Sequence, residues 1–341
     1  MKYPQTFKPA RCRRLKWLFA CAALLEFSSG HAEVYPLPAP DVDVVGELQH
    51  TRASQDDTLL DVARRFSLGQ DEIVMANPDV DRWLPGGGTE VLLPKQFILP
   101  DAPRSGIVLN VPEMRLFYIR PHGKNTLGEI VTYPVSIGRM DWRTPMGTTR
   151  VLEKLVDPVW RPPETIKVEH AADGDILPDV VPAGPNNPLG RFAMRLGIPG
   201  YLIHGTGLDK AFGIGMRVTH GCVRMYPEDI EQLFPQVPVG APVTIVNQPI
   251  KLGWKDGALY MEVHPPLDED NTGYEQMLAT ALDLIQKKMG PGTLTLDGRV
   301  VRHALEKPDG VPVVISRREA PPAAPVEDEQ SPPARTPIPA Y

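Results

Sequence analysis

Proline is the feature that most limits what this chain can fold into. There are 39 prolines among 341 residues. Because proline lacks a backbone N–H and fixes its φ angle, it interrupts helices and favours turns, strand ends and linkers. An all-helical protein is therefore excluded. With 42% hydrophobic residues the chain can still bury a substantial core, and its length fits two or three modules.

Residues 104–248 form the main β-rich unit of the sequence. Short runs rich in β-branched and aromatic residues follow one another here, separated by glycine, proline and asparagine turns: GIVLNV, MRLFYI, EIVTYPVSIG, TTRVLEKL, YLIHG and PVTIVN. This density of short strands predicts a β-sandwich or barrel. One helix is expected inside the unit, over residues 226–234, where Pro227 suits the first turn and two acidic residues follow it. The expected fold class is mainly β.

The N-terminus has the pattern of a secretory signal peptide over residues 1–32. A basic stretch (8–16) precedes a short apolar one (17–25), and small residues follow up to Ala32. The apolar run is too short to span a bilayer, so we expect cleavage before Glu33, with a retained anchor as the alternative. No other stretch could cross a membrane, so the mature chain is expected outside the cytoplasm without a stable membrane span.

Signal cleavage also changes the net charge. It removes six Lys/Arg and one Glu, which leaves 30 basic and 41 acidic residues and a net charge of −11. An acidic chain without a basic stripe is a poor candidate for binding nucleic acid. No nucleic-acid partner is therefore expected.

A Pro-rich linker (33–45) is expected to lead into a small α/β module over residues 46–99. In the stretch TLLDVARRF four apolar residues fall at helical spacing and make one face: Leu59, Val62, Ala63 and Phe66. A second short helix fits GQDEIVMAN, and LPGGGTEVLLP reads as a turn and a strand. The predicted order in this module is strand, helix, helix, strand.

Residues 249–315 are predicted to form a short α+β extension. ALYMEVH predicts a strand, and TGYEQMLATALDLIQKKMG predicts a helix that Gly290 and Pro291 end. LDGRVVRHALE and GVPVVIS are predicted to be short strands around turns. The Pro-rich residues 316–341 cannot bury enough surface to fold and are expected to be disordered.

A single cysteine remains in the mature chain. Cleavage removes Cys12 and Cys21 and leaves Cys222. Cysteines in an oxidising compartment normally occur in pairs. An unpaired one indicates a bond to another chain, a buried bystander or a reactive thiol.

Two histidines flank Cys222 in the sequence and favour the reactive thiol. His220 lies two residues before it, and His204 ends a predicted strand 18 residues upstream. The glycine-rich stretch between the histidines can fold back and bring His204 to Cys222. An imidazole can take the thiol proton, a backbone carbonyl can orient the imidazole, and the successive amides of His-Gly-Cys can donate to an oxyanion.

At these residues the sequence resembles a known family. HGTGLDKAFGIGMRVTHGCVRM (204–225) is similar to the signature of the L,D-transpeptidases, whose YkuD-type catalytic domain carries a histidine, a spacer and then Ser/Thr-His-Gly-Cys. GRMDWRTPMGTT (138–149) and VPAGPNNPLGRFAMRL (181–196) resemble further segments of that domain. Residues 46–99 resemble the LysM fold, a module that binds N-acetylated glycans. The layout over residues 46–290 resembles the Gram-negative periplasmic branch of the family.

The resemblance implies a role for each matching residue. Cys222 would be the nucleophile and His204 the base, with its ring oriented by the carbonyl of Gly205. His220 would line the site. The amides of Gly221 and Cys222 would form part of the oxyanion hole.

Thr219 and Arg224 are the implied substrate-side residues. Many family members carry asparagine where this chain has Arg224. The guanidinium of Arg224 could hold a substrate carboxylate through a bidentate pair. It could equally be a structural ion-pair partner of Asp229 or Glu228, and both interpretations stay open.

The implied activity is transpeptidation on peptidoglycan in the periplasm. The cysteine would attack the carbonyl of the third residue of a stem tetrapeptide, expel the terminal D-alanine and form a thioester. An amine of a second stem would give a 3→3 crosslink, and a lysine of an outer-membrane lipoprotein would give protein anchoring. The implied partners are therefore stem peptides, glycan and, as one candidate acceptor, a lipoprotein. No cofactor and no metal are implied. A lid that excludes water is expected from residues 161–187, which include His170.

Three alternatives remain from the sequence. A zinc site could use His204, His220, Cys222 and His264, although their spacing is unlike the usual zinc motifs. A non-enzymatic peptidoglycan-binding protein would use only the module at 46–99. A hydrolytic relative, either an L,D-carboxypeptidase or a lipoprotein-releasing amidase, would pass the same thioester to water.

Overall fold

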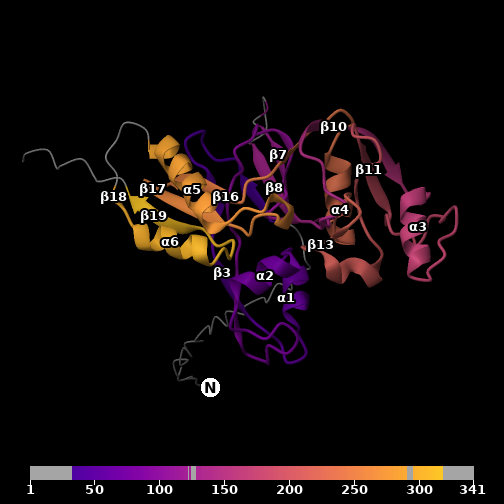
Figure 1. Ribbon diagram of the computed structural model, residues 1–341, viewed down its shortest axis with the longest axis horizontal. Coiled ribbons are helices and arrows are strands. Elements are labelled where there is room, and N and C mark those ends of the chain that lie inside the picture. Colours follow the sequence, from indigo (N-terminus) through magenta and orange to yellow (C-terminus); the bar gives the residue numbers. More distant parts are fainter. Residues whose placement is uncertain (1–32, 122, 124–127, 290–294, 318–341) are drawn as a thin grey trace, which may run out of the picture.

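The computed structural model describes residues 33–121, 123, 128–289 and 295–317. The expected signal peptide and nearly all of the expected disordered tail lie outside these residues. Figure 1 shows a β-rich centre, with a helix-covered C-terminal body at one end and helix α3 (Glu164–Ala172) at the other. The small N-terminal module, with helices α1 and α2, lies against one side of this arrangement.

Within the described residues, nine strands form the main sheet in the order β1-β8-β7-β6-β15-β10-β11-β12-β14. The first five are β1 (Val34–Pro36), β8 (Glu129–Pro134), β7 (Arg115–Arg120), β6 (Gly106–Asn110) and β15 (Pro242–Val246). The other four are β10 (Gly147–Val156), β11 (Phe192–Leu196), β12 (Leu202–His204) and β14 (Val223–Arg224). Neighbours are antiparallel except for the β15–β6 and β12–β14 pairs. This architecture confirms the mainly β prediction.

Both faces of the central strands are buried, because alternate residues enter two different cores. Ile107 and Leu109 of β6 pack in one core with Ile230 and Leu233, which lie on helix α4 (Pro227–Leu233). Val108, between them in the sequence, packs in the other core with aromatic and aliphatic residues of β7 and β8. A separate parallel pair, β9 (Ile137–Gly138) with β13 (Arg217–Thr219), supports the segment that carries Cys222.

The N-terminal module has the predicted order of elements. Strand β3 (Gln49–Arg52) is followed by α1 (Leu59–Arg65), α2 (Gln70–Ala76) and β4 (Glu90–Leu93), and β3 pairs with β4. Thr58 and Asp61 make a reciprocal capping box at the start of α1, which satisfies amides that the first helical turn leaves free. Strand β2 (Val44–Gly46) pairs with β5 (Gln96–Ile98) beside it.

The module docks on the glycine-rich segment between His204 and Cys222. The amide of Gln70, at the start of α2, donates to the carbonyl of Ile214 at 2.9 Å, and the amide of Asp71 donates to Gly215 at 3.2 Å. Gly215 has a φ of +84°, and a Cβ added there would lie 2.3 Å from the Cα of Gly69. Glycine is therefore required at this close approach.

The C-terminal body is a four-stranded sheet covered by two helices. Its strands are β16 (Ile250–Lys255), β17 (Ala258–Val263), β19 (Val313–Arg317) and β18 (Thr295–Leu296), and its helices are α5 (Tyr274–Met289) and α6 (Gly298–Glu306). Short 3₁₀ helices lie at Leu208–Gly213, Phe234–Gln236 and Asp268–Asp270. No helix in the described parts of the chain is both long and apolar enough to cross a bilayer.

Three segments differ from the expectations. The expected linker 33–45 supplies β1, which pairs with β8 at the edge of the main sheet. The stretch LDGRVVRHALE, expected to be a strand, forms α6, because Asp297 caps the amides of Arg299 and Val300 and two apolar residues one turn apart, Val301 and Leu305, are buried. The expected lid segment 161–187 contains α3, which the sequence pattern did not reveal.

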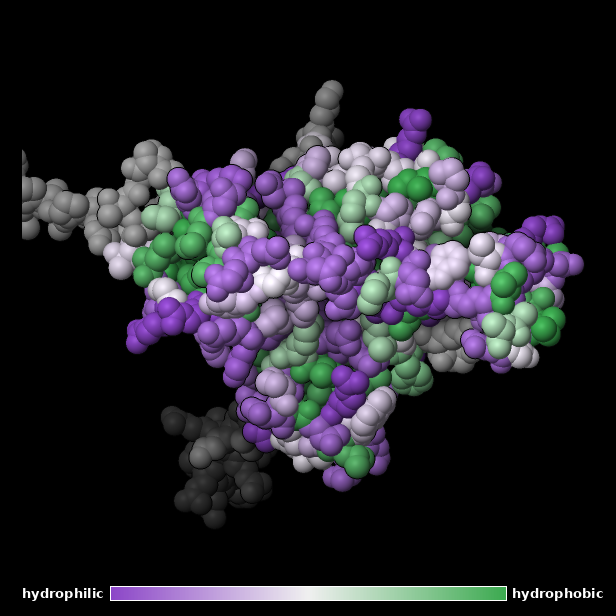
Figure 2. All heavy atoms as spheres, viewed as in Figure 1, coloured by the Kyte–Doolittle hydropathy of each residue, from purple (hydrophilic) through white to green (hydrophobic). Residues whose placement is uncertain are grey.

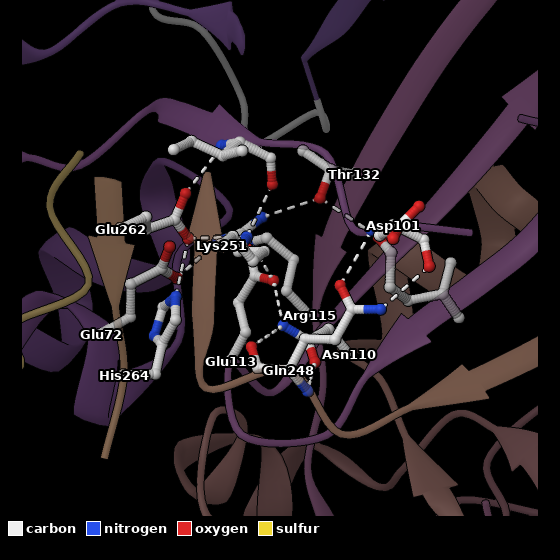
Figure 3. Close-up of polar contacts among 12 residues, drawn as sticks. Glu72, Asp101, Asn110, Glu113, Arg115, Thr132, Gln248, Lys251, Glu262 and His264 are labelled. Carbon is white, nitrogen blue, oxygen red and sulfur yellow. Dashed lines mark hydrogen bonds and ion pairs between the residues drawn. The ribbon is translucent and has the colours of Figure 1, made fainter. Parts of the chain in front are cut away.

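A buried polar cluster joins the main sheet, the N-terminal module and the C-terminal body (Figure 3). The ammonium of Lys251 lies 2.7 Å from a carboxylate oxygen of Glu113 and 2.7 Å from one of Glu262. It also donates to the carbonyl of Ile98 at 2.7 Å. His264 contacts Glu262 at 2.6 Å. These four side chains are at most 6% exposed, so the cluster is a fixed junction between the three parts.

Candidate active site

Parallel pairing of β12 and β14 brings the two central residues together. Ile203 lies opposite Val223, and His204 lies opposite Arg224. Cys222 directly precedes β14, and the charge of Arg224 acts on both His204 and Cys222. The pairing therefore brings the segment that carries Cys222 to the end of β12 that carries His204. Both side chains can therefore act on one substrate.

The ring of His204 is held in one orientation by the backbone carbonyl of the next residue, Gly205. Its Nδ1 lies 2.6 Å from the carbonyl oxygen of Gly205, so this nitrogen carries the donated hydrogen and leaves Nε2 able to accept a proton. The contact with Gly205 expected from the sequence is present. Burial, together with the charge of Arg224, lowers the pKa of His204 to about 3. The imidazole is therefore neutral at physiological pH, as a base must be.

Cys222 has a partly exposed thiol in a protein-lined environment. Its Sγ lies 3.6 Å from the carbonyl of Gly200, to which it donates. Burial raises the pKa of the Cys222 thiol, while a backbone hydrogen bond from Leu202 and the charge of Arg224 oppose this effect. The resting pair is thus a neutral thiol and a neutral imidazole, and proton transfer must accompany attack on a substrate.

The turn before Cys222 is tightly built. Gly221 has a φ of +97°, and a Cβ there would lie 2.7 Å from the ring of Tyr201, so glycine is required on both counts. The hydroxyl of Thr219 donates to the carbonyl of Cys222 at 2.6 Å and accepts from the amide of Gly221 at 3.2 Å. The carbonyl of Gly221 accepts from Thr144 at 2.9 Å.

These contacts change two expectations from the sequence. The hydroxyl of Thr219 is used inside the turn, and the residue is only 2% exposed, so it shapes the turn and is not placed to touch a substrate. The amide of Gly221 is already donated to Thr219, so in this conformation it does not point a free N–H at an oxyanion. The Cys222 amide stays the candidate donor.

His220 faces helix α3 rather than the sulfur. Its Nε2 lies 3.2 Å from a carboxylate oxygen of Glu169, and that carboxylate also pairs with Arg139. The ring of Trp142 meets His220 edge-on, with centroids 5.1 Å apart. The hydrogen-bond partner of His220 thus comes from α3, and its role in lining the site stays a prediction.

Arg224 acts on both central residues through its charge, which adds to the lowering of the His204 pKa and partly opposes the rise of the Cys222 pKa. The two acidic residues considered as its structural partners have other contacts. Glu228 pairs with Arg64 at 2.7 Å, and the carboxylate of Asp229 accepts from Ser67 at 3.2 Å. Both interpretations of Arg224 therefore stay open.

The four residues considered as zinc ligands do not converge. His264 belongs to the junction with Glu262 and Lys251, not to the site around Cys222 (Figure 3). In the described part of the chain, the only grouping of three or more potential metal ligands is Glu113, Glu262 and His264. The ammonium of Lys251 already lies between the two carboxylates of that grouping.

A cavity of about 670 Å³ lies beside the catalytic strands. Gly205 and Thr206 line it from the end of β12, and Phe192 and Ile230 form apolar walls. Neither Cys222 nor His204 lines this cavity, so it adjoins the site and does not contain the sulfur.

Sequence reasoning missed the residues that reach the site from a distance. Glu169 lies 51 positions before His220, and Thr144 lies 77 positions before Gly221. Only the Thr-Pro-x-Gly segment at Thr144 gave a signal, through its resemblance to a family motif. Nothing in the sequence around Glu169 predicted a contact with the cysteine turn.

Comparison with known proteins agrees with this geometry. Residues 104–245 match the model of the YkuD family, described as the L,D-transpeptidase catalytic domain. The chain is 38% identical over 322 residues to the probable L,D-transpeptidase YcfS of Escherichia coli (strain K12), covering 92% of this chain and 98% of that protein. The chain belongs to the L,D-transpeptidase family. It is also 40% identical over 310 residues to the probable L,D-transpeptidase YbiS of the same strain, covering 89% and 99% of the two chains.

Among solved structures, the chain is similar to L,D-transpeptidase 3 from Mycobacterium tuberculosis, with 19% sequence identity and a TM-score of 0.30. The match covers 46% of this chain and 67% of that one. A similarity of that size carries no argument here. The two Escherichia coli relatives cover nearly the whole of this L,D-transpeptidase, including the N-terminal module and the C-terminal body.

Proposed function

We propose that this chain crosslinks or modifies peptidoglycan in the periplasm through a thioester on Cys222. The observation that carries the proposal is the parallel pairing of β12, which ends at His204, with β14, which Cys222 directly precedes. The contact of His204 with Gly205 supports it, because that contact leaves Nε2 as the basic nitrogen. The stem tetrapeptide of peptidoglycan is the proposed acyl donor.

In the first half-reaction, the sulfur of Cys222 attacks the carbonyl carbon of the third stem residue while its proton passes to Nε2 of His204. The resulting oxyanion accepts a hydrogen bond from the Cys222 amide, and the charge of Arg224 stabilises the negative site. Collapse of the tetrahedral intermediate breaks the amide bond. The imidazolium returns its proton to the departing D-alanine amine, and the thioester remains.

In the second half-reaction, an acceptor amine attacks the thioester carbonyl and gives its proton to His204. The sulfur leaves and recovers a proton, and a new amide bond is formed. A stem-peptide amine gives a 3→3 crosslink, and a lipoprotein lysine gives anchoring. Water in place of the amine gives hydrolysis. His204 is neutral in the resting state, so its Nε2 is free of a proton and can accept one in each half-reaction.

The N-terminal module is proposed to hold the enzyme near glycan strands. The order β3-α1-α2-β4 supports the resemblance to LysM. Periplasmic localisation is proposed from the signal-peptide pattern of residues 1–32, which lie outside the described residues. Neither proposal affects the chemistry at Cys222.

The test is mass spectrometry of the products formed from a disaccharide-tetrapeptide donor. Wild-type protein should release D-alanine and yield a new muropeptide, whereas Cys222→Ala should yield neither. Parallel reactions with a second stem, a lysine-terminated peptide, or water alone identify the acceptor. Product formation by Cys222→Ala at the wild-type rate would contradict the proposed nucleophile.

A further inference from the structure

The carboxylate of Glu169 lies between two groups beside the nucleophile that are suited to binding an anion. It forms an ion pair with Arg139, and its other oxygen lies 3.2 Å from Nε2 of His220. Glu169 is on helix α3, whereas Arg139 and His220 are on segments that adjoin Cys222. The carboxylate of Glu169 on α3 thus contacts both the guanidinium of Arg139 and the imidazole of His220.

Arg139 is fixed to the cysteine turn by its backbone. Its amide donates to the carbonyl of Thr219 at 3.1 Å, and its own carbonyl accepts from the amide of Trp142 at 2.9 Å. The ring of Trp142 packs against His220. The guanidinium of Arg139 also lies 3.6 Å from a carboxylate oxygen of Asp141, so both Arg139 and His220 have contacts that do not involve α3.

The contact made by Glu169 is open to water, unlike the buried ion pair in the central junction. The side chains of Arg139 and Glu169 are 32% and 31% exposed, and that of His220 is 22% exposed. The pair of Lys251 and Glu113 in the central junction is 1% and 2% exposed. A carboxylate from outside the chain can therefore reach Arg139.

Helix α3 itself is weakly held. Ile166 is its one buried residue, and Val168 and Ile176 nearby are 63% and 78% exposed. Figure 2 shows apolar side chains at this end of the molecule, where Figure 1 places α3. Burial of one aliphatic side chain contributes only about 2 kcal/mol, so displacement of the helix is energetically accessible.

We propose that Glu169 occupies the binding position of a substrate carboxylate, and that the terminal α-carboxylate of the donor tetrapeptide displaces it from Arg139 and His220. This inference rests on the proposed function, which makes the stem peptide the donor. The terminal carboxylate is the candidate because it belongs to the residue that follows the cleaved carbonyl, and His220 lies two residues from Cys222. Donor binding then lifts α3, and α3 closes the site when D-alanine leaves.

The test measures binding in a Cys222→Ala background, in which no turnover occurs. Titration calorimetry compares the tetrapeptide with its C-terminal carboxamide. Glu169→Gln removes the internal competitor and should tighten tetrapeptide binding about three- to fivefold, the range of an exposed ion pair. Arg139→Gln should weaken it about tenfold or more, because a charge-assisted contact is lost. The matched control is Glu164→Gln, a change on the same helix, which should have no effect.

Two further results are expected. The carboxamide should bind the parent protein more weakly than the tetrapeptide does, and it should lose less affinity on Arg139→Gln. In the double variant Glu169→Gln/Arg139→Gln, the removal of Glu169 should no longer tighten tetrapeptide binding. The reason is that the guanidinium of Arg139, for which Glu169 and the tetrapeptide carboxylate compete, is absent.

Tetrapeptide binding that depends on neither Arg139 nor the terminal carboxylate would overturn this inference and leave the proposed function standing. Binding that depends on Arg139 but is unchanged by Glu169→Gln would overturn the assignment of Glu169 as the competing carboxylate. Failure of the tetrapeptide to bind the parent and every variant would contradict the proposed function and this inference together.

Discussion

At the scale of single residues, a few backbone contacts decide the chemistry of the site. The carbonyl of Gly205 selects the tautomer of His204, and the positive φ of Gly221 forms the turn that presents Cys222. The contact with Gly205 was implied by the family resemblance, whereas the positive φ of Gly221 was not predicted. The contact of Glu169 with His220 joins residues 51 positions apart, and no local pattern encodes it.

The thiol of Cys222 should be protonated at physiological pH and should react only through its thiolate fraction. Because burial raises its pKa, the rate of alkylation by iodoacetamide should rise with pH and reach its midpoint above the ordinary thiol value of about 8.5. Mass spectrometry of the peptide that contains Cys222 provides the rate. A plateau already complete below pH 7 would instead indicate a preformed thiolate–imidazolium pair.

At the scale of elements, local signals predicted six strands of the main sheet (β6, β7, β8, β10, β12 and β15) and α4, whose first turn carries Pro227 and two acidic residues. They gave no sign of β11 or β14. They failed for α6, where two valines suggested a strand and the Asp297 cap was decisive. The pairing of β1 with β8 joins segments far apart in the chain. Only the tertiary structure can specify such an edge pairing.

The docking of α2 on the glycine-rich segment should be sensitive to a single methyl group. Gly215→Ala places a Cβ 2.3 Å from the Cα of Gly69 at a φ of +84°, and should destabilise the protein by about 2 kcal/mol or more. The matched control is Gly213→Ala, whose Cβ meets only Val218 at 3.7 Å and should change stability by less than about 1 kcal/mol. Calorimetric melting gives both values, and equal effects would refute the close approach.

At the scale of the whole molecule, the junction around Lys251 connects the main sheet, the N-terminal module and the C-terminal body. The sequence predicted the boundaries of these parts but not the contacts between them. Glu113 comes from the loop before β7, Lys251 and Glu262 come from the C-terminal body, and Ile98 comes from β5. Burial raises the pKa of Glu113. The pKa of Glu262 is lowered, because Lys251 and His264 outweigh its burial. Composition cannot reveal such a cluster, because its members are spread over more than 150 residues.

Removal of the central ammonium should weaken the whole assembly. Lys251→Met leaves two buried carboxylates without their cation and should cost about 3–5 kcal/mol of unfolding free energy. Lys287→Met is the matched control, since Lys287 pairs with Asp283 on the surface and is 69% exposed; its loss should cost less than about 1 kcal/mol. Urea unfolding compares the two. If the two variants lose similar amounts of unfolding free energy, the ion pairs of Lys251 stabilise the protein no more than a surface ion pair does.

The most direct test of the central claim is the single-turnover rate at which a carbapenem, which acylates this family, forms an adduct on Cys222 when His204 is replaced. Both His204→Ala and the bulkier His204→Gln should slow adduct formation about 10²- to 10⁴-fold, while their melting temperatures show that the fold persists. Intact-mass measurement at short times gives the rates. If folded variants acylate Cys222 at the wild-type rate, His204 is a packed core residue, and the proposed thiol–imidazole pair does not operate.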